Sequence, residues 1–153
     1  MRDLNIYTTF HKITAMNVEL EPIIRLILGF VLSGVVGLER EVSLKPAGLR
    51  THLLVGLGST LVTILSLEAF PGADPSRVAA SIIVGIGFLG AGTIVKTQEK
   101  VIGLTTAATL WIVASIGVAT GTGFYILAIL ATVLAFFVLR LDIFERTPRR
   151  ITP

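Results

Sequence analysis

The chain has 153 residues, of which 53% are hydrophobic and 15% charged, and its mean hydropathy is +0.85. These values lie far from soluble averages, and the apolar residues form long blocks, which excludes a soluble globular or disordered protein. The chain has no cysteine, which excludes a thiolate nucleophile, a disulfide framework and a cysteine zinc site. We therefore expect an all-α integral membrane protein, a bundle of about five transmembrane helices.

Residues 1–22 precede the first apolar block and contain no continuous apolar region of signal-peptide length. We interpret them as an extracytoplasmic N-terminal segment. Pro22 suits the first position of a helix, so the first span is predicted over residues 23–38. Arg25, near the outer end of this span, is expected to extend its side chain to the membrane interface.

The stretch EREVSLKPAGLRTH, residues 39–52, is the most highly charged part of the chain and is expected to form a loop. The second span is predicted over residues 53–70, where Pro71 and Gly72 stop it. Asp74 then offers a helix cap for a third span, predicted over residues 77–95.

Residues 104–141 carry no charge except Arg140. As one helix they would be about 57 Å long, nearly twice the bilayer core of about 30 Å. They must therefore form a hairpin, and the sequence GVATGTG at residues 117–123 is the predicted turn. This gives a fourth span over residues 104–118 and a fifth over residues 124–141.

Five spans place the two termini on opposite sides of the membrane. The N-terminal side carries three basic residues outside the spans, and the other side, including the basic tail of residues 142–153, carries nine. The positive-inside rule places the side with nine in the cytoplasm, so the N-terminus is predicted outside and the C-terminus inside. The net charge of +3 therefore reports orientation, and no nucleic-acid partner is expected.

Glycines are frequent in the third span, and three of them match the dinucleotide-binding pattern G-x-G-x-x-G. We reject that reading because the next acidic residue is Glu99 and another apolar block follows, instead of a βαβ unit. Small residues let membrane helices approach closely, so we interpret those of spans one and three as packing residues. These residues are Gly29, Ser33, Gly37, Gly85, Gly87, Gly90 and Gly92.

The centres of the predicted spans contain no ionisable residue, which disfavours a carrier with a charged site at the midplane. Polar residues at the span ends are the functional candidates instead: Glu39, Arg40, Arg50, His52, Asp74, Arg77, Lys96, Thr105 and Thr106. Each has a structural alternative: for example, Asp74 as a helix cap, Glu39 in an ion network, or His52 as a satisfied interfacial residue. The candidate ligands for a hard cation such as Mg²⁺ are Asp74, Glu68 and Glu39.

No catalytic triad, metal centre or acid–base pair is legible in a chain with two histidines and no paired carboxylates inside a span. We therefore expect a protein that is not an enzyme. No cofactor is expected. Mg²⁺ would enter as a ligand or as a substrate.

Five motifs resemble, in order, those of the MgtC/SapB family: GLERE at 37–41, AGLRTHLLV at 47–55, DPSRVAA at 74–80, GIGFLGAG at 85–92 and GLTTAATLW at 103–111. The resemblance covers residues 20–141. It implies a bacterial or archaeal inner-membrane protein with four or five spans, associated with growth in low magnesium. For the MgtC branch it also implies virulence and restraint of the F-type ATP synthase.

The chain departs from MgtC proper, which continues into a soluble C-terminal domain, whereas here only residues 142–153 follow the fifth span. The short SapB/YhiD-like branch is therefore the expected match.

Three functions remain open. The first is a regulator of magnesium or ion homeostasis that acts on another membrane complex. The second is a transporter or channel for Mg²⁺ or another cation, formed at a subunit interface; it would need a polar path, for which Ser59, Thr63, Ser81 and Thr93 are candidates. The third is a purely structural small membrane subunit. The packing residues predict a homo-oligomer, since they exceed what five helices need.

Overall fold

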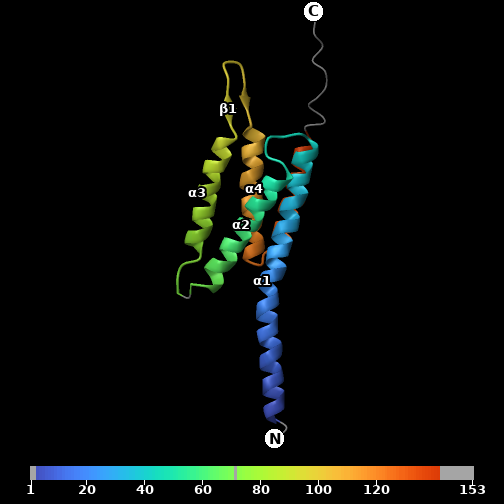
Figure 1. Cartoon of the computed structure of the whole chain (residues 1–153), viewed down its shortest axis with the longest axis vertical. Helices are drawn as coiled ribbons and strands as arrows, with labels where there is room; N and C mark the ends of the chain where they lie inside the picture. The colour runs from blue at the N-terminus through green and yellow to red at the C-terminus, as the bar shows by residue number, and fades with distance from the viewer. Residues whose placement is uncertain (1–2, 71, 142–153) are drawn as a thin grey trace, which may run out of the picture.

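The computed structural model describes residues 3–70 and 72–141, with side chains from residue 20 onward. The chain forms five helices and one two-stranded hairpin (Figure 1). The elements are α1 (Asp3–Val42), α2 (Leu49–Glu68), α3 (Ser76–Gly92), β1 (Val95–Lys96), β2 (Val101–Ile102), α4 (Leu104–Gly121) and α5 (Tyr125–Arg140). The prediction of an all-α membrane protein with about five apolar helices is confirmed.

Three helical stretches are long and apolar enough to cross a bilayer: Leu20–Val42 of α1, and the whole of α2 and α4. The other two apolar helices, α3 and α5, have 17 and 16 residues. At 1.5 Å per residue they are about 26 and 24 Å long, slightly short of a hydrocarbon core of about 30 Å. Local bilayer thinning or flanking side chains accommodate such a mismatch at a modest free-energy cost.

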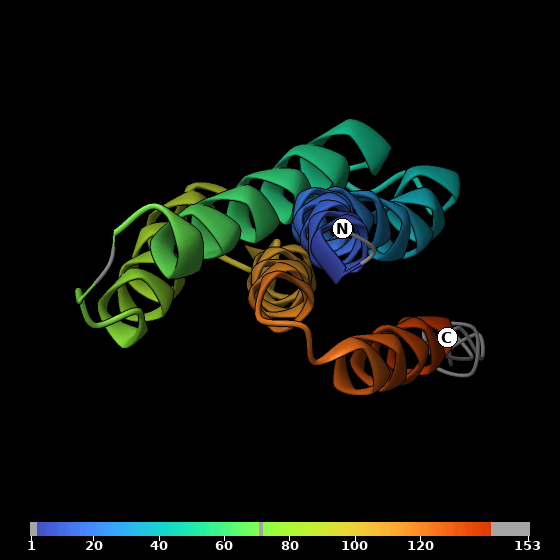
Figure 2. The ribbon, with the colours of Figure 1, turned by 90° about the horizontal axis from the view of Figure 1, so that it is seen from below.

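Helices α1, α2 and α4 contact one another and form the centre of the bundle. Seen from below, α3 and α5 lie on different sides of α4 (Figure 2). Helix α5 packs on α4 and α1, and α3 packs on α4 and to a lesser extent on α2. One buried apolar cluster joins α1, α4 and α5 through Leu32, Val36, Val113, Ile116, Ala128 and Leu139.

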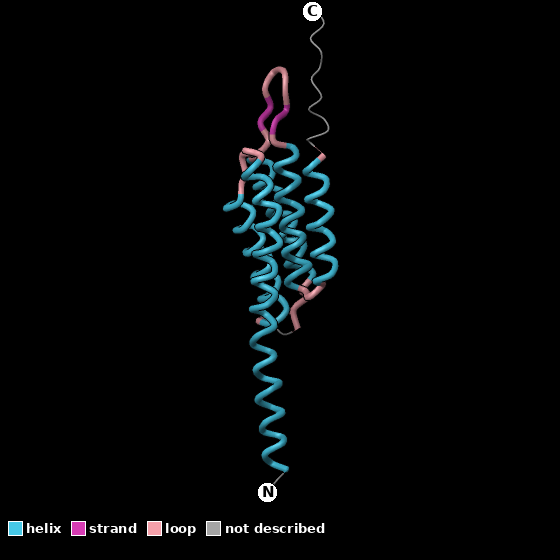
Figure 3. The backbone as a smooth tube through the Cα atoms, turned by 90° about the vertical axis from the view of Figure 1, so that its right-hand side faces the viewer, coloured by secondary structure: helices cyan, strands magenta, loops and turns pink. Residues whose placement is uncertain are grey.

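The two ends of the bundle differ. At one end, here called the hairpin end, lie the 43–48 loop and the β1–β2 hairpin, which projects beyond the helices (Figure 3). The strands pair antiparallel, with Val95 opposite Ile102. Gly103 closes this hairpin with φ of +94°, and a Cβ there would lie 1.9 Å from the carbonyl oxygen of Thr93. At the opposite end lie the 69–75 loop and the 122–124 turn.

Hydroxyl side chains face glycines where α2 meets α1. A Cβ added to Gly29 of α1 would lie 2.2 Å from Thr60 Oγ1, and one added to Gly56 of α2 would lie 1.6 Å from Ser33 Oγ. The two helices therefore approach as closely as small residues allow. Each hydroxyl donates to a carbonyl of its own helix, Ser33 to Gly29 and Thr60 to Gly56, so it is satisfied without water.

Helix α2 meets α4 in the same way on another side. A Cβ on Gly117 would lie 2.0 Å from Ser59 Oγ and 2.9 Å from the carbonyl oxygen of Gly56. One on Gly121 would lie 2.7 Å from Thr63 Cβ. Both Ser59 and Thr63 are buried, and each donates to a carbonyl of its own helix. Helix α2 is thus in close contact with α1 and α4 at once.

Four predicted boundaries are wrong. The loop predicted over residues 39–52 is confined to 43–48, because residues 39–42 belong to α1 and 49–52 to α2. The first helix does not begin at Pro22, because α1 runs through that residue from Asp3. The predicted turn at 117–123 is confined to 122–124, because Gly117 and Gly121 remain in α4 and pack against α2. The third helix ends at Gly92 rather than at residue 95, where β1 begins. The predicted tail, residues 142–153, lies outside the described residues.

Replacing Gly117 with Ala should lower the apparent unfolding temperature in detergent, because the new methyl group would collide with the Gly56 carbonyl, which is backbone and cannot rotate away. We expect a loss of roughly 1–3 kcal/mol. The matched control is Gly58→Ala in α2, where no atom lies within 4 Å of the added carbon. This control should be neutral or slightly stabilising. Equal unfolding temperatures for the two variants would contradict the close contact of α2 and α4.

Candidate functional site

The last turn of α1 carries a buried ion pair. Arg40 is 1% exposed and Glu39 6% exposed, and both Nε and Nη2 of Arg40 reach Glu39 Oε2. Ser43 Oγ donates to the other carboxylate oxygen, Oε1, at 2.8 Å. Adjacent residues on a helix do not face each other, so the Arg40 side chain must fold around the turn to reach its neighbour. The pair places two compensated charges inside the protein at the hairpin end.

His52 connects three helices beside this pair. Its ring is fully buried, and its Nδ1 lies 2.8 Å from the carbonyl oxygen of Gly48, which can only accept. The Nδ1–H therefore donates to this carbonyl, and Nε2 lies 3.1 Å from Thr109 Oγ1 of α4, within hydrogen-bond distance. On the α1 side, a Cβ on Gly37 would lie 2.8 Å from His52 Cβ, so no larger residue fits there.

Thr109 links His52 to the backbone of α4, because its hydroxyl donates to the carbonyl of Thr106. Its Oγ1 lies 2.7 Å from the carbonyl oxygen of Thr106 as well as near His52 Nε2. Since Thr106 is buried too, this short chain of hydrogen bonds lies wholly inside the protein. Here the GLERE, AGLRTH and GLTTAATLW motifs, distant in sequence, are brought together in space.

Glu41 caps α2 from a different helix. Its Oε2 accepts from the backbone N–H of Leu49 at 2.9 Å, in the first turn of α2. A carboxylate at a helix N-terminus satisfies a free donor and favours the helix dipole. Gly48 makes room for it, because a Cβ there would lie 1.8 Å from Glu41 Oε2. The sequence analysis did not predict this cap.

The other candidates at the hairpin end do not join the buried site. Arg50 is exposed on α2, Lys96 is exposed on β1, and Thr105 is exposed in the first turn of α4. Of the two predicted threonines, only Thr106 is buried. The site therefore consists of Glu39, Arg40, His52, Thr106 and Thr109.

The candidates at the opposite end have structural roles or stand exposed. Asp74 Oδ1 accepts from the backbone N–H of Ser76 at 2.9 Å, the contact of a helix cap for α3. Hydrogen bonds from the Ser76 hydroxyl and backbone, with the nearby charge of Arg77, hold the pKa of Asp74 below its ordinary value. Glu68 is exposed at the end of α2, and Arg77 is exposed on α3.

The three candidate Mg²⁺ ligands are not brought together, since Glu39 lies at the other end of the bundle from Asp74 and Glu68. Over residues 20–70 and 72–141, no three His, Asp or Glu side chains are grouped closely enough to hold a metal ion.

Arg25 forms a network that the sequence reasoning missed. Its Nη1 donates to the carbonyl oxygen of Gly121 at 3.0 Å, and Nε and Nη2 donate to Glu21. The hydroxyl of Tyr125 also donates to Glu21. Through these contacts Arg25 links α1 to the end of α4 and the start of α5. The spacing of Glu21 and Arg25, four residues apart on a helix, was the available signal.

The hydroxyls proposed for a polar path are divided between two places. Ser59 and Thr63 are buried between α2 and α4, whereas Ser81 is exposed on α3. Thr93, just after α3, donates to the carbonyl of Gly90, as Ser81 does to that of Arg77. The four hydroxyls therefore do not line one route through the chain.

The glycines of α3 contrast with those of α1. Nothing lies within 4 Å of a Cβ added to Gly85, Gly87 or Gly92, so these three pack against no other helix of the chain. Gly90 is buried and faces α4, where the Cβ of Ala107 would lie 3.5 Å from a Cβ added to Gly90. The side of α3 that carries Gly90 is thus packed, whereas Gly85 and Gly92, seven residues apart, share a face that is open, here called the open glycine face.

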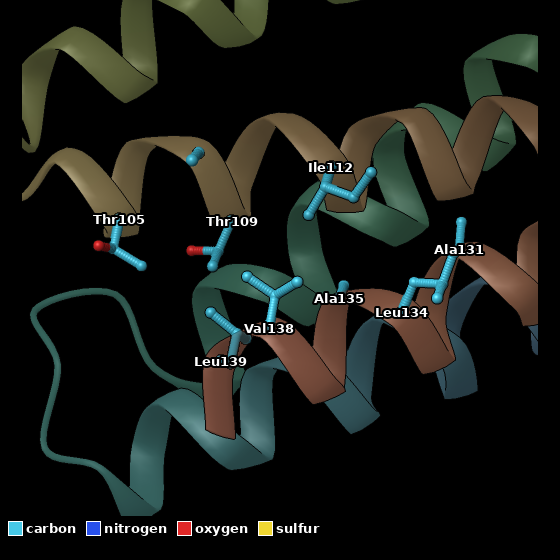
Figure 4. Close-up of a pocket in the computed structure, with 9 residues that line it drawn as sticks. Thr105, Thr109, Ile112, Ala131, Leu134, Ala135, Val138 and Leu139 are labelled. Atoms are coloured by element: carbon cyan, nitrogen blue, oxygen red, sulfur yellow. The ribbon is translucent and has the colours of Figure 1, made fainter. Parts of the chain in front are cut away.

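Two cavities lie beside α5. One, of about 410 Å³, lies between α4 and α5 and is apolar except for two hydroxyls, those of Thr105 and Thr109 (Figure 4). The other, of about 250 Å³, lies between α1 and α5 at the hairpin end. It is lined by Val35, Leu38, Glu39, Val42, Ser43, Phe136 and Arg140.

Breaking the buried ion pair should destabilise the protein strongly. Arg40→Met leaves the Glu39 carboxylate buried without its partner, and we expect a loss of about 3–5 kcal/mol. The double variant Glu39→Gln, Arg40→Met removes both charges and should recover much of this loss. Arg50→Met, at an exposed arginine, is the control. Thermal unfolding in detergent of the wild type, both single variants Glu39→Gln and Arg40→Met, the double variant and the control measures the coupling; additive losses would show that the two side chains are independent.

Removing the Thr109 hydroxyl should also destabilise the chain. Thr109→Val preserves the shape of the side chain but leaves the buried His52 Nε2 without its hydrogen-bond partner, at a loss of roughly 1–3 kcal/mol. Thr109→Ser keeps the hydroxyl and should remain closer to the wild type. The apparent unfolding temperature is the readout, and a Val variant as stable as the Ser variant would exclude the hydrogen bond.

Comparison with known proteins identifies the family. The model of the MgtC family matches residues 26–146. Over 139 residues, the chain is 45% identical to an Escherichia coli K12 protein named "Putative magnesium transporter YhiD", covering 86% of this chain and 64% of that protein.

Two further relatives come from other bacteria. Protein SapB of Bacillus subtilis 168 is 40% identical over 145 residues, covering 88% of this chain and 62% of SapB. Protein MgtC of Brucella abortus 2308 is 47% identical over 104 residues, covering 68% of this chain and 44% of MgtC. The chain thus spans less than two thirds of the length of each of these relatives, and no solved structure matches it. The motifs, the apolar helices and these matches agree that the chain belongs to the MgtC family.

Proposed function

We propose that this protein is a regulator in magnesium homeostasis that acts by binding another membrane complex. One observation carries the proposal: among residues 20–70 and 72–141, every buried side-chain nitrogen or oxygen has a hydrogen-bond partner. The buried carboxylate of Glu39 is occupied by Arg40 and Ser43, and His52 by Gly48 and Thr109. A cation would have to displace these internal partners to be coordinated within one chain.

The link to magnesium is supported by the names of relatives, since YhiD is named as a magnesium transporter and others as MgtC. Transport is therefore the second candidate function. In that case the path for Mg²⁺ or another cation would run between copies of the chain, because Ser59 and Thr63 are enclosed by α4. A homo-oligomer is part of our proposal in either case, and it is supported by the open glycine face of α3.

The proposed contact with another complex involves the hairpin end, which we place in the cytoplasm by the positive-inside rule. The β1–β2 hairpin projects beyond the helices (Figure 1), and its Lys96 and Lys100 are exposed. An exposed, charged element that does not pack on the bundle suits an electrostatically guided contact with a partner. No catalytic role is proposed.

Two measurements test this function together. Purified protein in liposomes containing a Mg²⁺ indicator should give no more flux than empty liposomes. In a bacterial strain that lacks its own family member, the wild type should restore growth in low magnesium. The variant Lys96→Glu, Lys100→Glu should fail to restore it, because charge reversal disrupts the partner contact. Arg77→Glu, at an exposed arginine of the opposite end, is the matched control and should restore growth.

Two outcomes would contradict the regulator proposal. Mg²⁺ flux above that of empty liposomes would establish transport if the double variant Asp74→Asn, Glu39→Gln abolished it. Growth restored equally by the hairpin variant and the control, with no flux, would favour a purely structural subunit. Membrane levels of each variant must match the wild type for the comparison.

A further inference from the structure

The cavity between α1 and α5 has the chemistry of a lipid site. One wall is apolar, formed by Val35, Leu38 and Val42 along α1 and by Phe136 of α5. Val35 and Val42 are seven residues apart, so this wall extends about 10 Å along the helix. All three α1 side chains are exposed in the chain, with Val42 at 73% and Leu38 at 54%, so the cavity opens toward the surrounding bilayer.

Among the described residues, the rim of the cavity carries one positive charge that has no ion-pair partner. Arg140, the last residue of α5, lies with its guanidinium carbon 5.3 Å from the centre of the Phe136 ring. A cation–π contact does not use the N–H donors in hydrogen bonds, so they can still bind an anion. The other charge at the rim, Glu39, is already neutralised by Arg40, and within the described part of the chain no carboxylate forms an ion pair with Arg140.

The level of the cavity in the membrane fits a headgroup. Arg140 ends α5 and Val42 ends α1, so the rim lies where both helices leave the apolar layer. An arginine can bind a phosphate through two parallel N–H donors, and basic pockets between transmembrane helices bind anionic lipid headgroups. An apolar wall that runs inward from such a cation matches the first part of an acyl chain.

We propose that this cavity binds an anionic phospholipid, with the phosphate on Arg140 and an acyl chain along Val35, Leu38 and Phe136. The lipid would fill the crevice between α1 and α5 at the end where the buried Glu39–Arg40 pair lies. The site therefore couples the lipid composition of that leaflet to the part of the bundle in which three sequence motifs meet. The inference does not depend on whether the protein regulates or transports.

Native mass spectrometry of the purified protein, released from a mixture of phosphatidylglycerol and phosphatidylcholine, tests this site. The wild type should retain phosphatidylglycerol in preference to phosphatidylcholine. Arg140→Gln should lower phosphatidylglycerol occupancy about fivefold, the effect of one basic charge beside an anionic surface. Arg140→Lys should retain most of it, and Arg77→Gln, at an exposed arginine of the opposite end, should retain all of it.

A second variant separates the cavity from its charge. Leu38→Trp fills the apolar wall but leaves Arg140 in place, and it should lose the lipid while keeping the wild-type unfolding temperature without added lipid. Inorganic phosphate, added as a competitor, should not displace the lipid. Equal phosphatidylglycerol occupancy in Arg140→Gln and the wild type, or no preference over phosphatidylcholine, would overturn the proposal. Retention of the lipid by a folded Leu38→Trp variant would overturn it as well.

Discussion

The close approach of α2 to α1 and α4 is the constraint on which the rest of the structure depends. Lipid supplies no hydrophobic force between helices, so their association rests on packing and hydrogen bonds. Glycines 29 and 56 on one side, and 117 and 121 on the other, leave room for hydroxyls of the facing helix. Because each hydroxyl donates to its own helix, the polar groups are buried without an unpaired donor.

This packing also positions the polar groups at both ends of the bundle. Gly37 lets α1 approach the first turn of α2, where His52 can reach across to Thr109 of α4. At the opposite end, the contact of Gly121 with Thr63 holds the end of α4 against α2, and Arg25 of α1 binds the Gly121 carbonyl. The polar site is thus a consequence of helix spacing as much as of the residues that form it.

The amino-acid pattern was sufficient to predict the membrane class, five apolar helices and the family. Helix boundaries were harder to predict, because glycine and proline occur both at helix ends and inside helices. Gly117 signals a turn by residue type but serves close packing here, and Pro22 suits a helix start but lies inside α1. Within the site, Glu39, Arg40, His52 and Thr106 were all candidates, but their grouping depends on three-dimensional contacts between segments more than fifty residues apart.

The partners of Glu41 and Arg25 could not be predicted for a related reason. Glu41 binds a backbone N–H, and Arg25 binds a backbone carbonyl as well as Glu21; no side-chain pattern marks such backbone partners in a sequence.

The same use of polar groups has a consequence for function. When buried side chains are engaged in holding helices together, the groups left for recognition are those that face outward. Here these are the open glycine face of α3, the lysines of the projecting hairpin and the guanidinium of Arg140. A protein built in this way offers its surroundings surfaces rather than an internal site, and we expect its specificity to reside there.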